Sequence, residues 1–461
     1  MVQIFTSAKY IPEKKYVFNV IFKEFWGIEY NLEFMEGMTD FIIGSNQIDS
    51  KVILPDIFFS TPDEKWLTKE SLPVLPLKNF EVEYLSFKQH VPVIYGVKAN
   101  DLKEQEYEII IDVFGSIFFC LSLYEEYVTP TYDSHERFLY TQSIAFKSNY
   151  YHRPVVNEYL EILWVSLKKK FPDLEKKRRE YKLILSHDVD WPLSNNLPIK
   201  EFLKECYRDL KYKKSIILFI HRIAAKALSI SPLNYTVDPY NNFNFLMGVS
   251  EDNNIKSEFN FIPTNGALNP KNEFNYDNYY ELDSSFFKSL LKRISKRGHI
   301  IGFHPSFYTL NNFDKLANEF YKFKRVCEEA GVYQTTWGGR HHYLRWQVSV
   351  SWPMWEELGL SYDSSVGSEF LLGFRCGTCY SFPVYDILKR QALRLREYPL
   401  IIMDMTVFTG QNLQDGLKKI LDFKEICKTY NGDLTLLIHN NYIITPAWKR
   451  FYKSLVNQLS K

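Results

Sequence analysis

The chain has 461 residues, a length that predicts two domains, because a single core seldom grows beyond about 250–300 residues. Hydrophobic residues make up 46% and charged residues 24%, a composition typical of a folded, soluble protein. The formal net charge of +1 gives no indication of strong attraction to nucleic acid or to an anionic membrane.

The N-terminal sequence Met1-Val2-Gln3-Ile4-Phe5 lacks a basic region followed by a long apolar stretch, so no signal peptide is predicted. No segment approaches the roughly 20 apolar residues of a transmembrane helix. Six cysteines in a chain of this length are not typical of a disulfide framework. These features together predict a cytoplasmic protein.

Residues 1–178 are predicted to form a smaller mixed α/β domain of unknown role. A charge-rich connector around Pro172 marks its end. Apolar runs predict strands at Tyr16–Phe22, Phe41–Ile43 and Val52–Leu54, a buried helix at Tyr107–Leu123 and an amphipathic helix at Val155–Lys168.

In residues 179–461, strand-like runs alternate with helix-like runs, and this alternation predicts a parallel sheet or barrel. Strands are expected at Lys182–Ser186, Phe259–Ile262, His299–Gly302, Leu360–Tyr362 and Leu434–Ile438. Helices are expected at Ile199–Tyr212, Phe286–Arg297, Asp314–Ala330, Val348–Leu358 and Asp415–Thr429. The short apolar run Ser215–Ile220 has basic flanks and predicts a further helix, with a place on the surface as one alternative.

Two carboxylates lie two residues apart where the first of these strands ends, in His187-Asp188-Val189-Asp190-Trp191. Residues i and i+2 of a strand face the same way, so Asp188 and Asp190 would point at one site. Two carboxylates at one site repel each other unless a cation or a shared proton compensates. This cost favours a metal site over a structural element.

Other polar residues also follow predicted strands, where function gathers in such folds. His304 would be a ready ligand for a divalent metal, and His439 an acid that titrates near pH 7. Asp363 follows a third strand, and His299, at a strand start, is expected to be structural. A purely structural role is the alternative for each of these residues.

A second cluster spans Gly338-Gly339-Arg340-His341-His342-Tyr343-Leu344-Arg345-Trp346. Arg340 could hold a carboxylate bidentately. Because adjacent residues of an extended chain face opposite ways, at most one of His341 and His342 is a ligand, and we choose His342. Arg345 and Trp346 suit either sugar or phosphate contact or surface packing.

One CxxC motif, Cys376-Gly377-Thr378-Cys379, has no second pair. Structural zinc usually needs four protein ligands, and no thioredoxin-like setting surrounds this motif. It is therefore predicted to be a tight loop.

The order of these motifs resembles the polysaccharide deacetylase superfamily of metal-dependent carbohydrate esterases, also called the NodB-homology domain, over roughly residues 180–461. The resemblance implies an irregular (β/α) barrel. It implies that Asp188 is the general base and Asp190 a metal ligand. It also implies that His304, in Gly298-His299-Ile300-Ile301-Gly302-Phe303-His304, binds the metal, that Arg340 orients the base, and that His439, in Leu436-Leu437-Ile438-His439, is the general acid.

The whole chain resembles a bacterial subgroup of this superfamily. Its members pair an uncharacterised N-terminal domain with a deacetylase-like domain and are found with surface-polysaccharide genes. The segments that carry this resemblance are residues 112–116, 152–158, 186–191, 304–306, 340–346 and 373–379.

One departure concerns the second metal histidine of the superfamily, which lies four residues after the first. Here that position is Tyr308, a poor neutral ligand. His342 is the best replacement and His187 a second one. The sequence after Asp363 also departs from the superfamily, because Ser364-Ser365-Val366-Gly367 does not complete its orienting motif.

The predicted function is hydrolysis of an acetyl group, N-acetyl in the leading form, on a sugar of a surface polysaccharide or its precursor. The cofactor would be a divalent metal, zinc in the leading form, and the partner a carbohydrate. Substrate contacts are assigned to Trp191, Tyr308, Tyr343, Arg345 and Trp346. The alternatives are a glycan-binding or assembly protein on a degenerate deacetylase fold, and a hydrolase of an O-acetyl ester or a cyclic amide.

Overall fold

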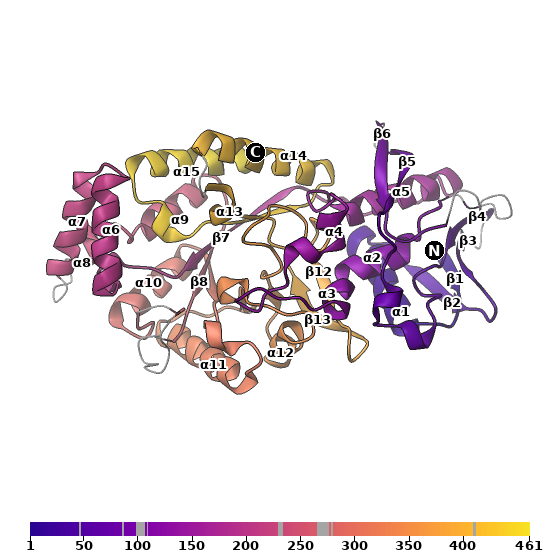
Figure 1. Ribbon diagram of the computed structural model, residues 1–461, viewed down its shortest axis with the longest axis horizontal. Coiled ribbons are helices and arrows are strands. Elements are labelled where there is room, and N and C mark those ends of the chain that lie inside the picture. Colours follow the sequence, from indigo (N-terminus) through magenta and orange to yellow (C-terminus); the bar gives the residue numbers. More distant parts are fainter. Residues whose placement is uncertain are drawn as a thin grey trace.

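The computed structural model describes residues 1–45, 48–84, 87–97, 107, 109–228, 234–264, 276–277, 280–408 and 412–461. The molecule is elongated, with the N-terminal region at one end of its long axis and the helices α6 (Ile199–Lys211) and α7 (Ile216–Ala227) at the other (Figure 1). Within the described ranges, no helix combines the length and apolar character needed to cross a bilayer.

The N-terminal region is mixed α/β, as predicted. A four-stranded sheet has the order β2-β1-β3-β4, and β5 and β6 form a separate antiparallel hairpin. Its strands are β1 (Val2–Thr6), β2 (Tyr30–Phe34), β3 (Asp40–Ser45), β4 (Ile48–Pro55), β5 (Lys78–Tyr84) and β6 (Phe87–Val93). Its helices are α1 (Ile11–Phe18), α2 (Val113–Leu121), α3 (Tyr124–Val128), α4 (Ile144–Lys147) and α5 (Val155–Lys170).

The strand predicted at Tyr16–Phe22 is wrong, because this run is helical. It belongs to α1 and to the wider π-helical turn Asn19–Trp26 that follows. All but Asn19 of its residues are buried, so its apolar pattern reflects burial on most sides of a helix. Periodicity alone does not separate such a helix from a buried strand.

The other predictions for this region hold in part. Strands are present at Phe41–Ile43 and Val52–Leu54, and α5 matches the predicted amphipathic helix. The buried helix expected at Tyr107–Leu123 begins only at Val113, and residue 108 lies outside the described residues. Its start is fixed by Asp112, whose Oδ1 accepts a hydrogen bond from the Gly115 N–H at 2.8 Å.

The rest of the chain is built around a nine-stranded, mostly parallel sheet with the order β12-β13-β11-β10-β9-β8-β7-β15-β14. β7 lies between β8 and β15 and is parallel to both, whereas β12 and β13 are antiparallel. The strands are β7 (Lys182–Val189), β8 (Glu258–Phe261), β9 (Ile300–Phe303), β10 (Gly338–Gly339), β11 (Tyr362–Asp363), β12 (Phe382–Asp386), β13 (Gln391–Glu397), β14 (Ile402–Met403) and β15 (Asp433–Leu437).

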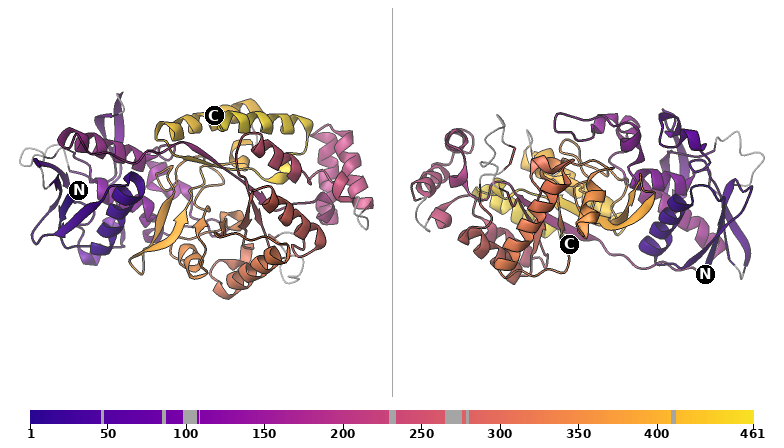
Figure 2. Two further views of the ribbon diagram at one scale, coloured as in Figure 1. Left: turned by 180° about the vertical axis from the view of Figure 1, so that it is seen from behind. Right: turned by 90° about the horizontal axis from the view of Figure 1, so that it is seen from below.

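Helices lie around this sheet, in the connections between its strands and after its last strand (Figures 1 and 2). Besides α6 and α7, they are α8 (Asn234–Val237), α9 (Phe243–Glu251), α10 (Ser285–Lys296), α11 (Phe313–Glu329), α12 (Ser351–Glu357), α13 (Asp404–Phe408), α14 (Leu413–Thr429) and α15 (Pro446–Leu459). The predicted α/β alternation is therefore confirmed. Among the described residues the hydrogen-bonded order has two edges, β12 and β14, so the closed barrel stays a prediction.

The two regions share one continuous hydrophobic core, whose residues extend along the chain from Val2 in β1 to Leu459 in α15. Polar contacts also join them: the Tyr16 hydroxyl donates to the Pro383 carbonyl at 2.8 Å, and the Tyr385 hydroxyl donates to Glu13 at 3.0 Å. The predicted boundary at residue 178 falls in the segment between α5 and β7.

Candidate metal centre

The two carboxylates predicted to face one site come from the end of β7. Asp188 is buried, and its Oδ1 accepts hydrogen bonds from Arg340 Nη1 at 2.8 Å and Asn260 Nδ2 at 2.7 Å. Asn260 faces it because β8 pairs with β7 in a register that sets the two residues side by side. On the next strand, a Cβ at Gly302 would come within 1.8 Å of the Asn260 amide oxygen, so this close approach requires glycine.

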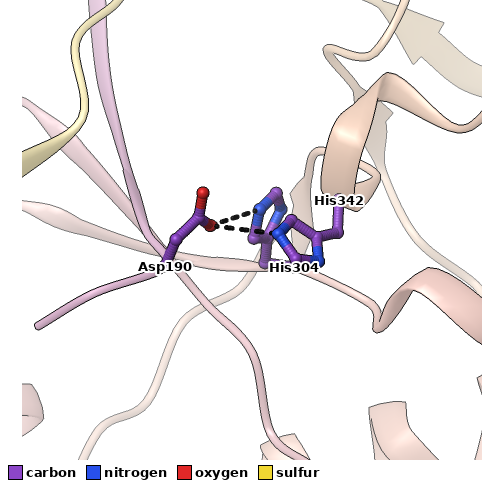
Figure 3. A group of neighbouring side chains, drawn as sticks. All are labelled: Asp190, His304 and His342. Atoms are coloured by element: carbon purple, nitrogen blue, oxygen red, sulfur yellow. Dashed lines mark ion pairs between the residues drawn. The ribbon is translucent and has the colours of Figure 1, made fainter. Parts of the chain in front are cut away.

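Asp190 lies one residue beyond β7 and meets two histidines from other segments (Figure 3). Its Oδ1 is 3.3 Å from His304 Nε2 and 3.5 Å from His342 Nε2. One ligand atom from each of the three residues lies within 4.8 Å of the others. His304 follows β9, and His342 lies in the segment after β10.

These three residues fit a divalent cation. Asp190 Oδ1 and His304 Nε2 are buried and 3.3 Å apart, yet among the described residues neither atom makes a hydrogen bond of good geometry, which is unusual for polar atoms in a folded protein. Burial alone would lower the pKa of His342, but Asp190 and Asp277 raise it to about 9, so the group favours positive charge. One carboxylate and two imidazoles also form the donor set of a catalytic zinc site with an open position.

The rings of both histidines are oriented by partners behind them. His304 Nδ1 donates to the Arg340 carbonyl oxygen at 2.5 Å, and His342 Nδ1 is 3.3 Å from Asp277 Oδ1. Because the Nδ1 atoms are engaged, each ring turns its Nε2 toward Asp190. Such outer partners are typical of metal-binding histidines.

His439 lies beside the second carboxylate oxygen of Asp190 and is held there by a buried carboxylate. Asp404, at the start of α13, lies 2.9 Å from His439 Nδ1 and also accepts the His439 backbone N–H at 2.7 Å. His439 Nε2 then lies 3.5 Å from Asp190 Oδ2. Burial alone would lower the pKa of His439, but Asp404 and then Asp190 raise it to about 10, which favours the protonated imidazole.

Arg340 is completely buried and fixed at both ends of its guanidinium. Besides Asp188, it donates to the Ser364 carbonyl and the Ser364 hydroxyl, both at 2.8 Å. Asp363 accepts the Ser365 N–H at 3.0 Å and so shapes the turn that carries Ser364. Burial would raise the pKa of Asp188, but Arg340 and His304 hold it below its ordinary value, so Asp188 is a carboxylate.

The acidic and imidazole groups open into a cavity of about 400 Å³. Two of the five residues predicted to contact substrate, Trp191 and Tyr343, line it. Aromatic and sulfur-containing side chains form much of the remaining wall, namely Phe370, Met403, Met405 and Tyr442. Such a wall, with convergent polar groups at one end, is typical of a small-molecule site.

The N-terminal region contributes to this cavity through residues 131–138, here called the arm. A bridge between Tyr132 and Phe138 closes the arm, whose His135 ring stacks on Tyr343 at a centroid distance of 5.2 Å. Arg137 lines the cavity and pairs with Glu369 at 2.6 Å. The wall of the site is therefore built from both regions of the chain.

The other three residues predicted to contact substrate lie outside the cavity. Tyr308 packs against Phe307, and Lys315 lies over its ring. Arg345 pairs with Glu136 of the arm at 2.9 Å, and Trp346 is completely buried. Their positions give no support to the predicted contacts, because packing and an ion pair already account for these side chains.

Two other histidines that the sequence placed near the site, His341 and His187, do not belong to the metal group. His341 is buried against the Trp355 ring, and burial lowers its pKa to about 3. His187, the second replacement considered for Tyr308, turns away to the Ile438 carbonyl at 2.7 Å. The structure therefore brings only His342, of the two replacements, to Asp190 and His304.

The remaining sequence predictions near the site concern His299 and the CxxC motif. His299 Nδ1 accepts the Ser257 N–H at 3.1 Å, a structural role as predicted. Cys376 and Cys379 are buried free thiols in a turn where Gly377 has φ of +66°, which confirms the tight loop.

Sequence reasoning missed Asp277, Asp404, Asn260 and the arm. Asn260 gave a signal, because it is the polar residue inside the otherwise apolar run Phe259–Ile262. Asp404 follows the two-residue β14, which is too short to be recognised from an apolar pattern. Asp277 and the arm lie in segments without regular periodicity, so only the folded chain reveals them.

Comparisons with known proteins give limited matches. Residues 2–172 match the model of a family of unknown function, DUF7033, which covers less than half of the chain. No curated protein matches. One solved structure, described as a "putative polysaccharide deacetylase" from Mycobacterium smegmatis, is 13% identical over 62% of this chain and 85% of that chain, with a TM-score of 0.38. A TM-score this low does not establish a shared fold.

Proposed function

We propose that the protein is a metal-dependent hydrolase that removes an acetyl group from the nitrogen of a sugar. The observation that carries the proposal is the convergence of Asp190, His304 and His342 beside a buried carboxylate and a buried imidazole at one end of a cavity. The sequence resemblance to carbohydrate deacetylases supports the same reaction. It also suggests a surface polysaccharide or its precursor as the substrate.

Asp190, His304 and His342 would hold a divalent cation, zinc in the leading form. Bound there, the cation would supply a Lewis acid for the acetyl carbonyl. Arg340 and Asn260 fix Oδ1 of Asp188, which leaves Oδ2 on the side of His304, 3.9 Å from its Nε2. Asp188 would act from there as the base that takes a proton from the attacking water.

His439 would give its Nε2 proton to the leaving amine. Its position suits this step, because Nε2 faces Asp190 and the cavity while Asp404 engages Nδ1. The aromatic wall formed by Trp191, Tyr343 and Tyr442 would accept the sugar ring.

The first experiment measures bound metal and acetate release in three proteins. The wild type, purified and then incubated with zinc, should carry about one zinc per chain and release acetate from N-acetylated sugars. Asp190→Ala/His304→Ala should lose both properties. Asp188→Asn should keep the metal and lose turnover by about 10²-fold or more, because it removes only the base.

The matched control is His90→Ala, which removes an exposed histidine of β6 in the N-terminal region, outside the cavity of the metal group, and should change neither property. No zinc in the wild type would refute the proposal in favour of a glycan-binding protein on this fold. Bound zinc together with acetate release from O-acetyl esters only would show that the protein is an esterase and does not hydrolyse N-acetyl groups. Full activity in Asp188→Asn would remove the base from the mechanism.

A further inference from the structure

The helical pair α6–α7, here called the hairpin, exposes two apolar stripes at the end of the molecule opposite the N-terminal region (Figure 1). On α6 the exposed apolar residues follow a spacing of three to four, which places them on one face of the helix. On α7, Ile216, Ile220 and Ile223 follow the same spacing, and Ile217 widens their stripe. The exposed residues are Ile199, Leu203, Tyr207 and Leu210 on α6, Tyr212 after it, and Ile216, Ile217, Ile220 and Ile223 on α7.

Exposed apolar side chains are concentrated in the hairpin and are not spread evenly over the surface. Of the 22 large apolar side chains that are exposed among the described residues, nine lie within residues 199–223. Ile216 and Ile217 are each 65% exposed. Single exposed apolar residues are normal, but a dense group marks an interaction surface.

The stripes do not face the core of the protein, because the two helices of the hairpin pack against each other through a separate inner core. Phe202 and Cys206 of α6 pack there with Leu218 of α7. Between the helices, Arg222 and Asp209 form a completely buried ion pair at 2.7 Å. The inner faces of the two helices are therefore already packed against each other, and the outer stripes are available to a partner.

Basic residues surround these stripes. Residues 199–227 carry eight lysines and arginines against three carboxylates, whereas the whole chain has a net charge of only +1. No carboxylate in the described part of the chain pairs with Lys200, Lys211 or Lys214, all of which are exposed. The balanced total charge thus conceals a cationic hairpin and a net negative remainder.

We infer that the hairpin docks the protein onto an anionic lipid surface, with both helices lying in the interface plane. Exposed isoleucines flanked by lysines provide the two attractions that hold an amphipathic helix at such a surface. A second copy of the chain fits less well, because a two-fold contact would place the same lysines against each other.

The hairpin also lies beside the candidate metal centre. A second cavity, lined by Arg208 and Lys213 of the hairpin side, shares Asn441 and Tyr442 with the cavity of the metal centre. Docking would therefore bring the mouth of the site close to the lipid headgroups. The docking inference itself does not depend on the reaction proposed for the site.

The test is co-sedimentation of the full chain with vesicles of equal parts phosphatidylcholine and phosphatidylglycerol, and with vesicles of phosphatidylcholine alone. The wild type should bind the anionic vesicles, and high salt should weaken binding. Lys200→Gln/Lys211→Gln/Lys214→Gln should weaken it by about 10²-fold. Ile217→Ser/Ile220→Ser should weaken it by about tenfold or more.

Two controls remove equivalent groups elsewhere. Lys15→Gln/Lys51→Gln/Lys65→Gln has the same net charge as the triple lysine variant of the hairpin. Tyr321→Ser/Tyr333→Ser removes exposed apolar side chains outside the hairpin. Both should bind like the wild type. The metal content of every variant is measured in parallel, which separates a failure of docking from a failure of the metal centre.

A wild-type protein that does not bind anionic vesicles would overturn the inference. So would a dimer in solution that the isoleucine variant dissociates, because the hairpin would then be an interface between copies. Equal loss of binding in hairpin and control variants would show that vesicle binding does not use this surface.

Discussion

At the scale of single residues, the site depends on buried partners that orient the chemical groups. Asp404 lies 2.9 Å from His439 Nδ1 and so fixes this ring with its Nε2 toward Asp190. Asp404 is completely buried and also accepts the backbone N–H of His439. In the proposed reaction it is therefore a positioning residue, which would act through His439.

Asp404→Asn should lower kcat by about 10²- to 10⁴-fold, the usual contribution of a general acid, because the amide holds the imidazole less well. Bound metal should stay at the wild-type level, since Asp404 is not one of the three ligand residues. Steady-state kinetics and metal analysis check the two expectations. Asp386→Asn is the matched control, because Asp386 is also buried and accepts backbone N–H groups, in a turn outside the site. An unchanged kcat in Asp404→Asn would contradict the role of His439.

The sequence alone predicted that Asp188, Asp190, His304 and His439 would meet, because each ends a recognisable apolar strand. The parallel order of these strands then brings their carboxyl ends together. Partners such as Asp277 and Asp404 could not be predicted, since they come from short or irregular segments whose positions depend on the whole fold. These partners act through their charge and their position in the folded protein, and neither can be inferred from the spacing of residues in the local sequence.

At the scale of elements, the arm connects the N-terminal region to the candidate site. Arg137 holds it by an ion pair with Glu369 and by a hydrogen bond to the Tyr343 carbonyl at 3.1 Å. Tyr343 in turn stacks on His135 and lines the cavity. The arm therefore fixes one aromatic wall without touching the metal group.

Arg137→Ala should raise KM by about tenfold, equivalent to roughly 1.4 kcal/mol of lost binding, with kcat nearly unchanged. The reason is that the wall binds the substrate and its transition state alike. Arg390→Ala is the control, because it breaks another ion pair between the two regions, with Glu13, away from the cavity. A fall in kcat with constant KM would instead place the arm in the chemical step.

The elements themselves were predictable where one periodicity dominated. Strands that end in polar residues, such as β7 and β15, were found from their apolar runs, and α11 and α14 from helical spacing. The run Tyr16–Phe22 was not, because it is buried on most sides and its composition suits either state. Two-residue strands such as β10 carry too few residues for any pattern.

At the scale of the whole molecule, the two regions are packed as one body. Asn157 of α5 accepts hydrogen bonds from the Thr378 hydroxyl at 2.9 Å and the Cys379 N–H at 3.1 Å. Arg375 binds Glu126 of α3 through two bonds, at 2.7 and 2.6 Å, in a buried position. Because polar contacts of this kind lie within a shared core, the two regions should unfold together.

Glu126→Ala should lower the free energy of unfolding by about 3–5 kcal/mol, because it leaves the Arg375 charge buried and unpaired. The measurement is urea unfolding followed by both tryptophan fluorescence and far-UV circular dichroism, whose midpoints should coincide in the wild type and shift together in the variant. Glu64→Ala removes an exposed carboxylate from the same region and should change the free energy by less than about 0.5 kcal/mol. Two separate transitions, of which Glu126→Ala moves only one, would show instead that the regions are independent, and the arm would then be a mobile cover over the cavity and not part of its wall.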